Sequence, residues 1–346
     1  MSQQIPVLDS RMVPLMPTSP AHARKLLDNG KASAYWNKLG IFCIILHKEV
    51  VPDNQKLVVG IDPGSKWTGW SVVGQHKTVL NGMQEEPIHV KGAVERRRNL
   101  RKSRRHRNCW RRPARFNRNR NKKWLPPSTL ARWNSKVRIL KQIKRVLPIT
   151  DVCVEDIAAK TRKGARKFNV NFSPLEVGKA WFYQTIRDMR LKLELFRGYD
   201  TKMLRDTYRL KKTSVKSRKV FESHAVDAWV MAASICGAGQ PTTKDLNYWT
   251  PIVLNRRQLH MFQFTKGGTR RPQGGTRSMG FSRGTLVRHP KWKLTYIGGS
   301  YKGRISLHSV RTGKRITKIA KSEDLNILTK VTWRGTRTIP LSAHHN

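Results

Sequence analysis

Short apolar runs alternate with stretches of three- and four-residue periodicity along most of the chain, which predicts an α/β fold. Residues 57–62 (LVVGID) read as an apolar strand, and the turn signal at 63–65 (PGS) separates it from strands expected at 67–73 and 78–83. Residues 152–157 (VCVEDI) are almost wholly apolar, as in a strand from the middle of an α/β sheet. The three early strands predict a meander.

Apolar positions spaced by three or four residues predict three helices. The first has Ser128 as its candidate N-cap and is stopped by Pro148. The second begins at Pro174 and ends at Gly198. Its apolar stripe consists of Phe182, Ile186, Met189, Leu193 and Phe196. The third covers residues 224–239 and is apolar nearly all round, which is typical of a buried helix.

The two ends of the chain follow other patterns. Near the start, several prolines hold the chain extended before a short helix that begins near Ala21, and a strand is expected at 41–46. After residue 240, short apolar runs broken by Gly and basic residues predict a small β-rich, SH3-like barrel. Its expected strands are 285–287, 294–297, 304–308 and 315–319. The Gly- and Arg-rich loop at 267–283 is expected to meet phosphates.

The net charge of the chain adds an expectation about its binding partner. The 346 residues include 70 Lys and Arg against 21 Asp and Glu, so the formal net charge is +49, while 38% of the residues are hydrophobic. That hydrophobic share is enough to bury the cores of two or three domains. The chain is therefore expected to fold and to bind a polyanion.

Other classes of protein are disfavoured. The longest apolar run, 41–46, is too short to span a membrane, and the first residues lack the regions of a signal peptide. The four cysteines form no CxxC pair, so neither a zinc ribbon nor a disulfide framework is indicated. We expect a cytoplasmic protein with reduced thiols and no membrane partner.

The densest charge lies in residues 91–123, which hold sixteen Lys or Arg against one acid, Glu95. Residues 93–110 contain no Gly or Pro, so they are expected to form a helix once phosphates screen the charge, and Pro113 is expected to end or kink it. A disordered basic tail is the alternative, but apolar elements flank the segment on both sides. The expected nucleic-acid contacts are Arg96, Arg97, Arg98, Arg101, Arg104, Arg105, Arg107, Trp110, Arg111, Arg112, Arg115, Arg118 and Arg120.

Three acids occur inside apolar elements, where an ionised carboxylate is costly unless it is paired or bound to metal. They are Asp62 at the end of the first strand, Glu155 in the later strand and Asp227 in the buried helix. Each has a structural alternative: a turn, an ion pair or a helix N-terminus, respectively. Asp156 is a possible substitute for Glu155, because a shift of one residue turns the opposite face inward.

Together the three acids indicate a divalent-metal site. Hard oxygen ligands favour two Mg²⁺ ions, with Mn²⁺ as a substitute, and such a pair can activate water for phosphodiester cleavage. His224 lies three residues before Asp227 on the same helix face, where it would act as the general base or orient the water. Catalytic roles are therefore predicted for Asp62, Glu155, His224 and Asp227.

Three motifs resemble the split pieces of a RuvC nuclease, which has an RNase H-like fold: GIDPGS at 60–65, VEDI at 154–157 and HAVDAW at 224–229. The arginine-rich segment resembles the bridge helix of RNA-guided nucleases. PLMP at 14–17 resembles the N-terminal module of the IscB and IsrB proteins. The metal carboxylates of that family match Asp62, Glu155 and Asp227.

One difference distinguishes these two relatives. IscB carries an HNH nuclease between its second and third RuvC pieces, but residues 158–223 contain no histidine, which an HNH site requires. The chain therefore resembles IsrB. The resemblance implies an RNA-guided nickase that binds a structured omega RNA, reads a motif beside its target duplex DNA and cleaves the displaced non-target strand. It also implies a monomeric ribonucleoprotein in a prokaryotic cytoplasm, associated with the nucleoid when bound to DNA.

The expected domains follow from the same comparison: an N-terminal PLMP-like module at 1–54, RuvC pieces at 55–90, 125–200 and 201–240, the bridge helix at 91–124 and a β-rich domain that contacts the target-adjacent motif or RNA at 241–346. Two other functions remain open. One is an RNA-binding or chaperone protein with a non-catalytic core, and the other is a RuvC-like nuclease that needs no RNA.

Overall fold

The computed structural model describes residues 4–106, 125–157, 173–215, 217–253 and 277–338, together with the backbone of two short strands at 262–263 and 268–269. The chain divides into two compact units. The first contains Asn54–Leu246, and the second combines Ser2–Asp53 with Asn247–Thr338. The second unit is therefore built from both ends of the chain.

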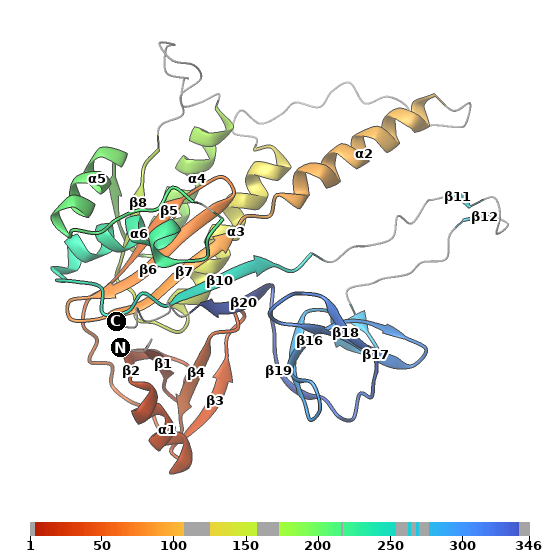
Figure 1. Ribbon diagram of the computed structural model, residues 1–346, viewed down its shortest axis with the longest axis horizontal. Coiled ribbons are helices and arrows are strands. Elements are labelled where there is room, and N and C mark those ends of the chain that lie inside the picture. Colours follow the sequence, from red (N-terminus) through yellow and green to blue (C-terminus); the bar gives the residue numbers. More distant parts are fainter. Residues whose placement is uncertain are drawn as a thin grey trace, which may run out of the picture. The chain divides into compact units, whose positions relative to one another are not determined.

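The first unit is built on a mixed sheet (Figure 1). Its strands lie in the order β7 (Thr78–Glu85), β6 (Trp67–Gly74), β5 (Leu57–Pro63), β8 (Asp151–Glu155) and β9 (Lys192–Phe196). The meander β5–β6–β7 is antiparallel, whereas β5, β8 and β9 run parallel. Strands β5 and β8 are covered on both faces, which explains why their sequences are nearly continuous apolar runs.

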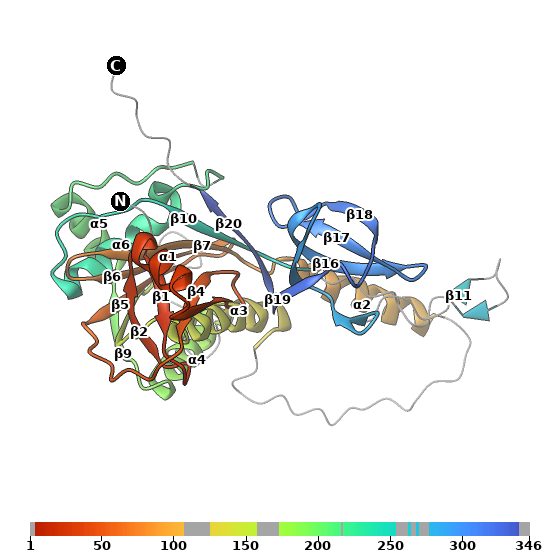
Figure 2. The ribbon, with the colours of Figure 1, turned by 90° about the horizontal axis from the view of Figure 1, so that it is seen from below.

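Five helices lie in the described part of this unit. They are α2 (His89–Arg105), α3 (Pro127–Lys144), α4 (Pro174–Asp188), α5 (Gly198–Thr207) and α6 (Phe221–Cys236). Helix α6 covers one face of the sheet, and α3 and α4 cover the other (Figure 2). Nearly all of α6 is buried, as its apolar sequence predicts.

Two glycines allow α6 to lie directly on the sheet. A Cβ atom on Gly60 would come within 1.7 Å of the Ala228 carbonyl oxygen, and one on Gly69 within 1.9 Å of the His224 carbonyl oxygen. No larger residue fits between these backbones, so the close approach of α6 depends on both glycines.

The opposite face carries a buried polar ladder between the meander and α3. Lys136 and Thr68 both donate to Glu86 Oε1, at 2.7 and 2.6 Å. Next to them, Gln84 donates to Ser135 Oγ at 2.6 Å and accepts from Trp70 Nε1. These contacts pair most of the buried polar groups, and Glu86 Oε2 is left without a hydrogen-bond partner among the described residues.

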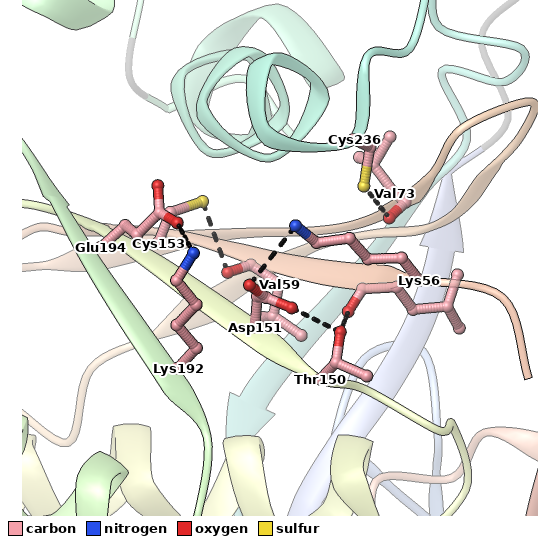
Figure 3. Close-up of polar contacts among 10 residues, drawn as sticks. Lys56, Val59, Val73, Thr150, Asp151, Cys153, Lys192, Glu194 and Cys236 are labelled. Carbon is pink, nitrogen blue, oxygen red and sulfur yellow. Dashed lines mark hydrogen bonds and ion pairs between the residues drawn. The ribbon is translucent and has the colours of Figure 1, made fainter.

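At the edge where β5 and β8 begin, polar contacts hold the strand ends together (Figure 3). Lys56 pairs with Asp151 at 3.5 Å, and Thr150 Oγ1 donates to Asp151 Oδ2. The thiol of Cys153 donates to a carbonyl oxygen of β5 and that of Cys236 to one of β6. Burial raises the pKa of Cys236 to about 11, so this thiol is protonated and inert at neutral pH.

The N-terminal part of the second unit is a small sheet with one helix. The strand order is β2 (Pro14–Thr18), β1 (Ile5–Leu8), β4 (Phe42–Leu46) and β3 (Ala32–Trp36). Helix α1 (Pro20–Asp28) begins after Ser19, whose hydroxyl accepts a hydrogen bond from the His22 N–H.

The C-terminal part is rich in β-structure. An antiparallel sheet has the order β18 (Arg315–Ala320), β17 (Arg304–Ser309), β16 (Lys293–Tyr301), β15 (Thr285–His289) and β19 (Asn326–Lys330). Strands β10 (Leu246–Pro251) and β20 (Trp333–Thr338) pair with each other. Two short hairpins pair β11 (Phe262–Gln263) with β12 (Gly268–Thr269), and β13 (Arg277–Ser278) with β14 (Phe281–Ser282).

The N-terminal and C-terminal parts of this unit are in contact. The Thr332 N–H donates to the Lys38 carbonyl oxygen at 3.4 Å. A cavity of about 230 Å³ is lined by residues from both parts, including Phe42 and Trp249. The N-terminal sheet and the C-terminal strands therefore stabilise each other.

Two details of the predicted helices are wrong. Helix α3 begins after Pro126, and Ser128 lies inside its first turn rather than at its N-cap. Helix α4 ends at Asp188, so Leu193 and Phe196 belong to β9, and Gly198 begins α5 instead of ending α4. The helical spacing of apolar residues in α4 continues past Met189 to Leu193 and Phe196, which is why a longer helix was predicted. Residues 192–196 (KLELF) also alternate between polar and apolar, as a strand does. These residues form a strand because they pair with β8.

Across the described ranges, no helix combines the length and the apolar character needed to cross a bilayer.

Candidate metal centre

Three carboxylates converge on the α6 side of the first unit. Asp62 lies near the end of β5, Glu155 is the last residue of β8, and Asp227 lies on α6. One carboxylate oxygen from each lies within 4.8 Å of the others. The register between β5 and β8 pairs Ile61 with Val154, so the next residue of each strand comes to the same edge.

Two of the three carboxylates are closed to water. Asp227 is 0% and Glu155 9% exposed, whereas Asp62 is half-buried. Burial, together with the negative charges of Glu155 and Asp227, raises the pKa of Asp62 well above its usual range. Three such groups at this spacing need cations, and an all-carboxylate ligand set suits a hard divalent ion such as Mg²⁺ or Mn²⁺.

Three further side chains contact the cluster. Arg205 of α5 pairs with Asp227 Oδ1 at 2.5 Å, and Lys212 pairs with the other oxygen, Oδ2. Thr201 donates from Oγ1 to Glu155 Oε1 at 3.1 Å. None of these three side chains was predicted from the sequence. The buried Asp227 signalled the need for a cation, but among 70 Lys and Arg nothing in the pattern selects two.

Asp156 is not part of the cluster. Its Oδ1 accepts hydrogen bonds from Lys179 Nζ at 2.7 Å and from the Tyr183 hydroxyl at 2.9 Å, both on α4. Burial opposes its ionisation, but these hydrogen bonds outweigh burial and lower the pKa of Asp156. Successive residues at a strand end point to opposite faces, so Glu155 faces α6 and Asp156 faces α4.

His224 is buried beside the site. It is 5% exposed, and the centre of its ring lies 5.3 Å from that of Trp67. It is not one of the three residues that form the carboxylate cluster. Its role as base or water-orienting group stays a prediction.

The basic segment is described only in part. Helix α2 covers Arg96, Arg97, Arg98 and Arg101, whose side chains are exposed, and its backbone includes Arg104 and Arg105. The remaining predicted contacts lie outside the described residues: Arg107, Trp110, Arg111, Arg112, Arg115, Arg118 and Arg120. A row of exposed arginines along one helix is suited to phosphates.

Comparison with known proteins gives a match to one family and matches to 11 chains of solved structures, among them two of RuvC. Residues 5–168 match the family described as RRXRR protein. No curated protein matches the chain. The structure of T. thermophilus RuvC in complex with Holliday junction substrate is 13% identical, with a TM-score of 0.29, and that of Thermus thermophilus RuvC is 13% identical, with a TM-score of 0.28. Each match covers 54% of this chain and 99% of the other.

The range matched by the family contains Asp62, Glu155 and the arginine-rich segment.

Proposed function

We propose that this chain is a Mg²⁺-dependent DNA endonuclease that nicks one strand under the guidance of an RNA. The observation that carries the proposal is the convergence of Asp62, Glu155 and Asp227 from three separate elements to within 4.8 Å. A buried cluster of this kind destabilises the fold unless it binds cations, so its presence needs a functional reason.

In this proposal the three carboxylates hold two divalent ions. Bound there, the ions would supply an activated water and stabilise the leaving oxygen during phosphodiester hydrolysis. A water oxygen bonds to phosphorus while the phosphorus bond to the leaving sugar oxygen breaks, and the water proton passes to a base. His224 is the candidate base. Thr201 fixes the orientation of Glu155 through its hydrogen bond.

RNA guidance is the finer part of the proposal. It is supported by the resemblance to IsrB and by the exposed arginines of α2, which suit a nucleic-acid backbone held without regard to its sequence. In such a complex, base pairing selects the target and the protein reads only a short flanking motif. We assign that reading to the C-terminal β-rich part.

The guide is tested by expressing the full chain with its native flanking DNA and sequencing the RNA that co-purifies with it. A single structured species with one variable end supports guidance. A mixture dominated by ribosomal and transfer RNA would support the RNA-binding alternative instead.

Cleavage is tested on a supercoiled plasmid that carries the matching target. We expect Mg²⁺-dependent nicking that EDTA abolishes and that Glu155→Gln lowers by at least about 100-fold, because the charge on a metal ligand is lost.

Asp156→Asn is the matched control. It neutralises the adjacent acid, which faces α4, and should leave nicking within about threefold of the unaltered protein, because it lies outside the cluster. Equal loss in both variants would contradict the assignment of the metal centre.

A further inference from the structure

The segment that joins α5 to α6 places an ammonium group on the carboxylate cluster. Lys212 contacts Asp227 Oδ2, and its side chain is 30% exposed. The ammonium of Lys212 therefore pairs with one of the three carboxylates that would hold a divalent ion.

The backbone on both sides of Lys212 is anchored. Before it, the Leu210 N–H donates to the Arg205 carbonyl oxygen at 2.9 Å, which closes the end of α5. After it, the Thr213 N–H donates to the Glu222 carbonyl oxygen at 3.0 Å, at the start of α6. Lys212 is thus held beside the cluster by the fold, while its long side chain can move.

We propose that Lys212 is a resident counter-ion of the carboxylate cluster, which divalent ions displace and which then binds the phosphate of the substrate. This inference rests on the function proposed above. An ammonium and two divalent ions cannot share one small cluster, because the cations repel one another. Once displaced, the ammonium remains within reach of an anion that enters with the ions, and a phosphodiester supplies one. Lysine binds phosphate as a point charge, so this contact needs no fixed geometry.

The proposal predicts opposite effects on metal binding and on turnover. In Lys212→Met, divalent ions no longer compete with the ammonium, so the affinity for Mn²⁺, measured by calorimetry without DNA, should rise on the order of 3- to 10-fold. In the same variant, nicking at saturating Mg²⁺ should fall roughly 100-fold, because one preorganised cation is missing from the phosphate. A residue that only supports the fold would lower both.

Two variants serve as controls. Lys211→Met removes an exposed neighbouring charge and should change neither quantity. Lys212→Arg keeps a cation at the position and should retain most of the nicking activity, and its Mn²⁺ affinity should stay near that of the unaltered protein. If Lys212→Met does not fold, Lys212→Gln, which removes the charge but keeps a polar side chain, carries the same two predictions.

The outcomes separate this inference from the proposed function. Unchanged or weaker Mn²⁺ binding in Lys212→Met would overturn the counter-ion role, and unchanged nicking would overturn the phosphate contact. If the unaltered protein with its RNA does not nick DNA, the proposed function and the phosphate contact fall together, while the Mn²⁺ comparison still decides whether Lys212 is a counter-ion.

Discussion

Lys136 and Glu86 form an ion pair that water hardly reaches. Their side chains are 3% and 0% exposed, and burial lowers the pKa of Lys136 even though Glu86 opposes that shift. The pair belongs to the polar ladder between the meander and α3, on the face of the sheet away from the carboxylate cluster. A buried pair of this kind adds little net stability, yet removing one partner leaves an uncompensated charge.

Lys136→Met is therefore expected to lower the free energy of unfolding by about 3–5 kcal/mol, because Glu86 stays buried without its cation. The double variant with Glu86→Gln should recover much of that loss, since no charge is then stranded. Urea unfolding of the three proteins provides the measurement. A double variant as unstable as Lys136→Met would show that packing, and not charge, causes the loss.

At the scale of single residues, the sequence predicted which three acids come together but not which face each occupies. VEDI contains two adjacent acids, and only the pairing of β8 between β5 and β9 turns Glu155 toward α6. The cations of the site could not be predicted, because Arg205 and Lys212 come from a basic stretch without a pattern. Their selection depends on how α5 packs against α6.

At the scale of elements, the position of α6 depends on two glycines in the sheet. Gly60 and Gly69 let the α6 backbone lie on β5 and β6, and this contact brings Asp227 to Asp62. The apolar sequence of α6 predicted that this helix is buried. How closely it approaches the sheet depends on the glycines of β5 and β6, which the sequence of α6 does not reveal. The C-terminal end of α4 could not be predicted from its apolar spacing either. The strand β9 follows closely, and its apolar residues continue that spacing.

Gly60→Ala is expected to destabilise the protein by about 1–3 kcal/mol, because a methyl group would overlap the Ala228 carbonyl. It should also lower Mg²⁺-dependent nicking, since α6 must move and carry Asp227 with it. Thermal unfolding and the plasmid assay measure the two effects. Gly239→Ala is the control, because a Cβ atom there meets nothing within 4 Å. Full nicking in Gly60→Ala would show that the site tolerates displacement of α6.

At the scale of the whole molecule, the net positive charge is the main determinant of how the protein binds nucleic acid. A formal charge of +49 means that binding to nucleic acid should release many counterions. The fold class and the β-rich character of the C-terminal part could be predicted from pattern alone. The joining of both chain ends in one unit could not, because it depends on contacts between residues about 300 positions apart, which leave no periodicity to read.

The affinity for target DNA should fall steeply with salt, with a log–log slope of roughly −0.9 per phosphate contact. Changing the exposed arginines Arg96, Arg97, Arg98 and Arg101 to Gln should make the slope shallower by about 0.9 for each lost contact. The control removes the same charge elsewhere in the first unit, at Lys141, Arg187, Arg190 and Lys192. Equal changes in slope for both sets would mean that α2 is no preferred contact.

Because the second unit combines an N-terminal and a C-terminal part of the chain, its two parts are synthesised at different times. Its first part ends at Asp53, but its partner strands extend to Thr338. At ~5–20 residues per second, a ribosome needs roughly 15 to 60 s to make the intervening chain. The N-terminal sheet is therefore made long before the last strands that belong to its unit. All three residues of the carboxylate cluster, Asp62, Glu155 and Asp227, are synthesised within that interval.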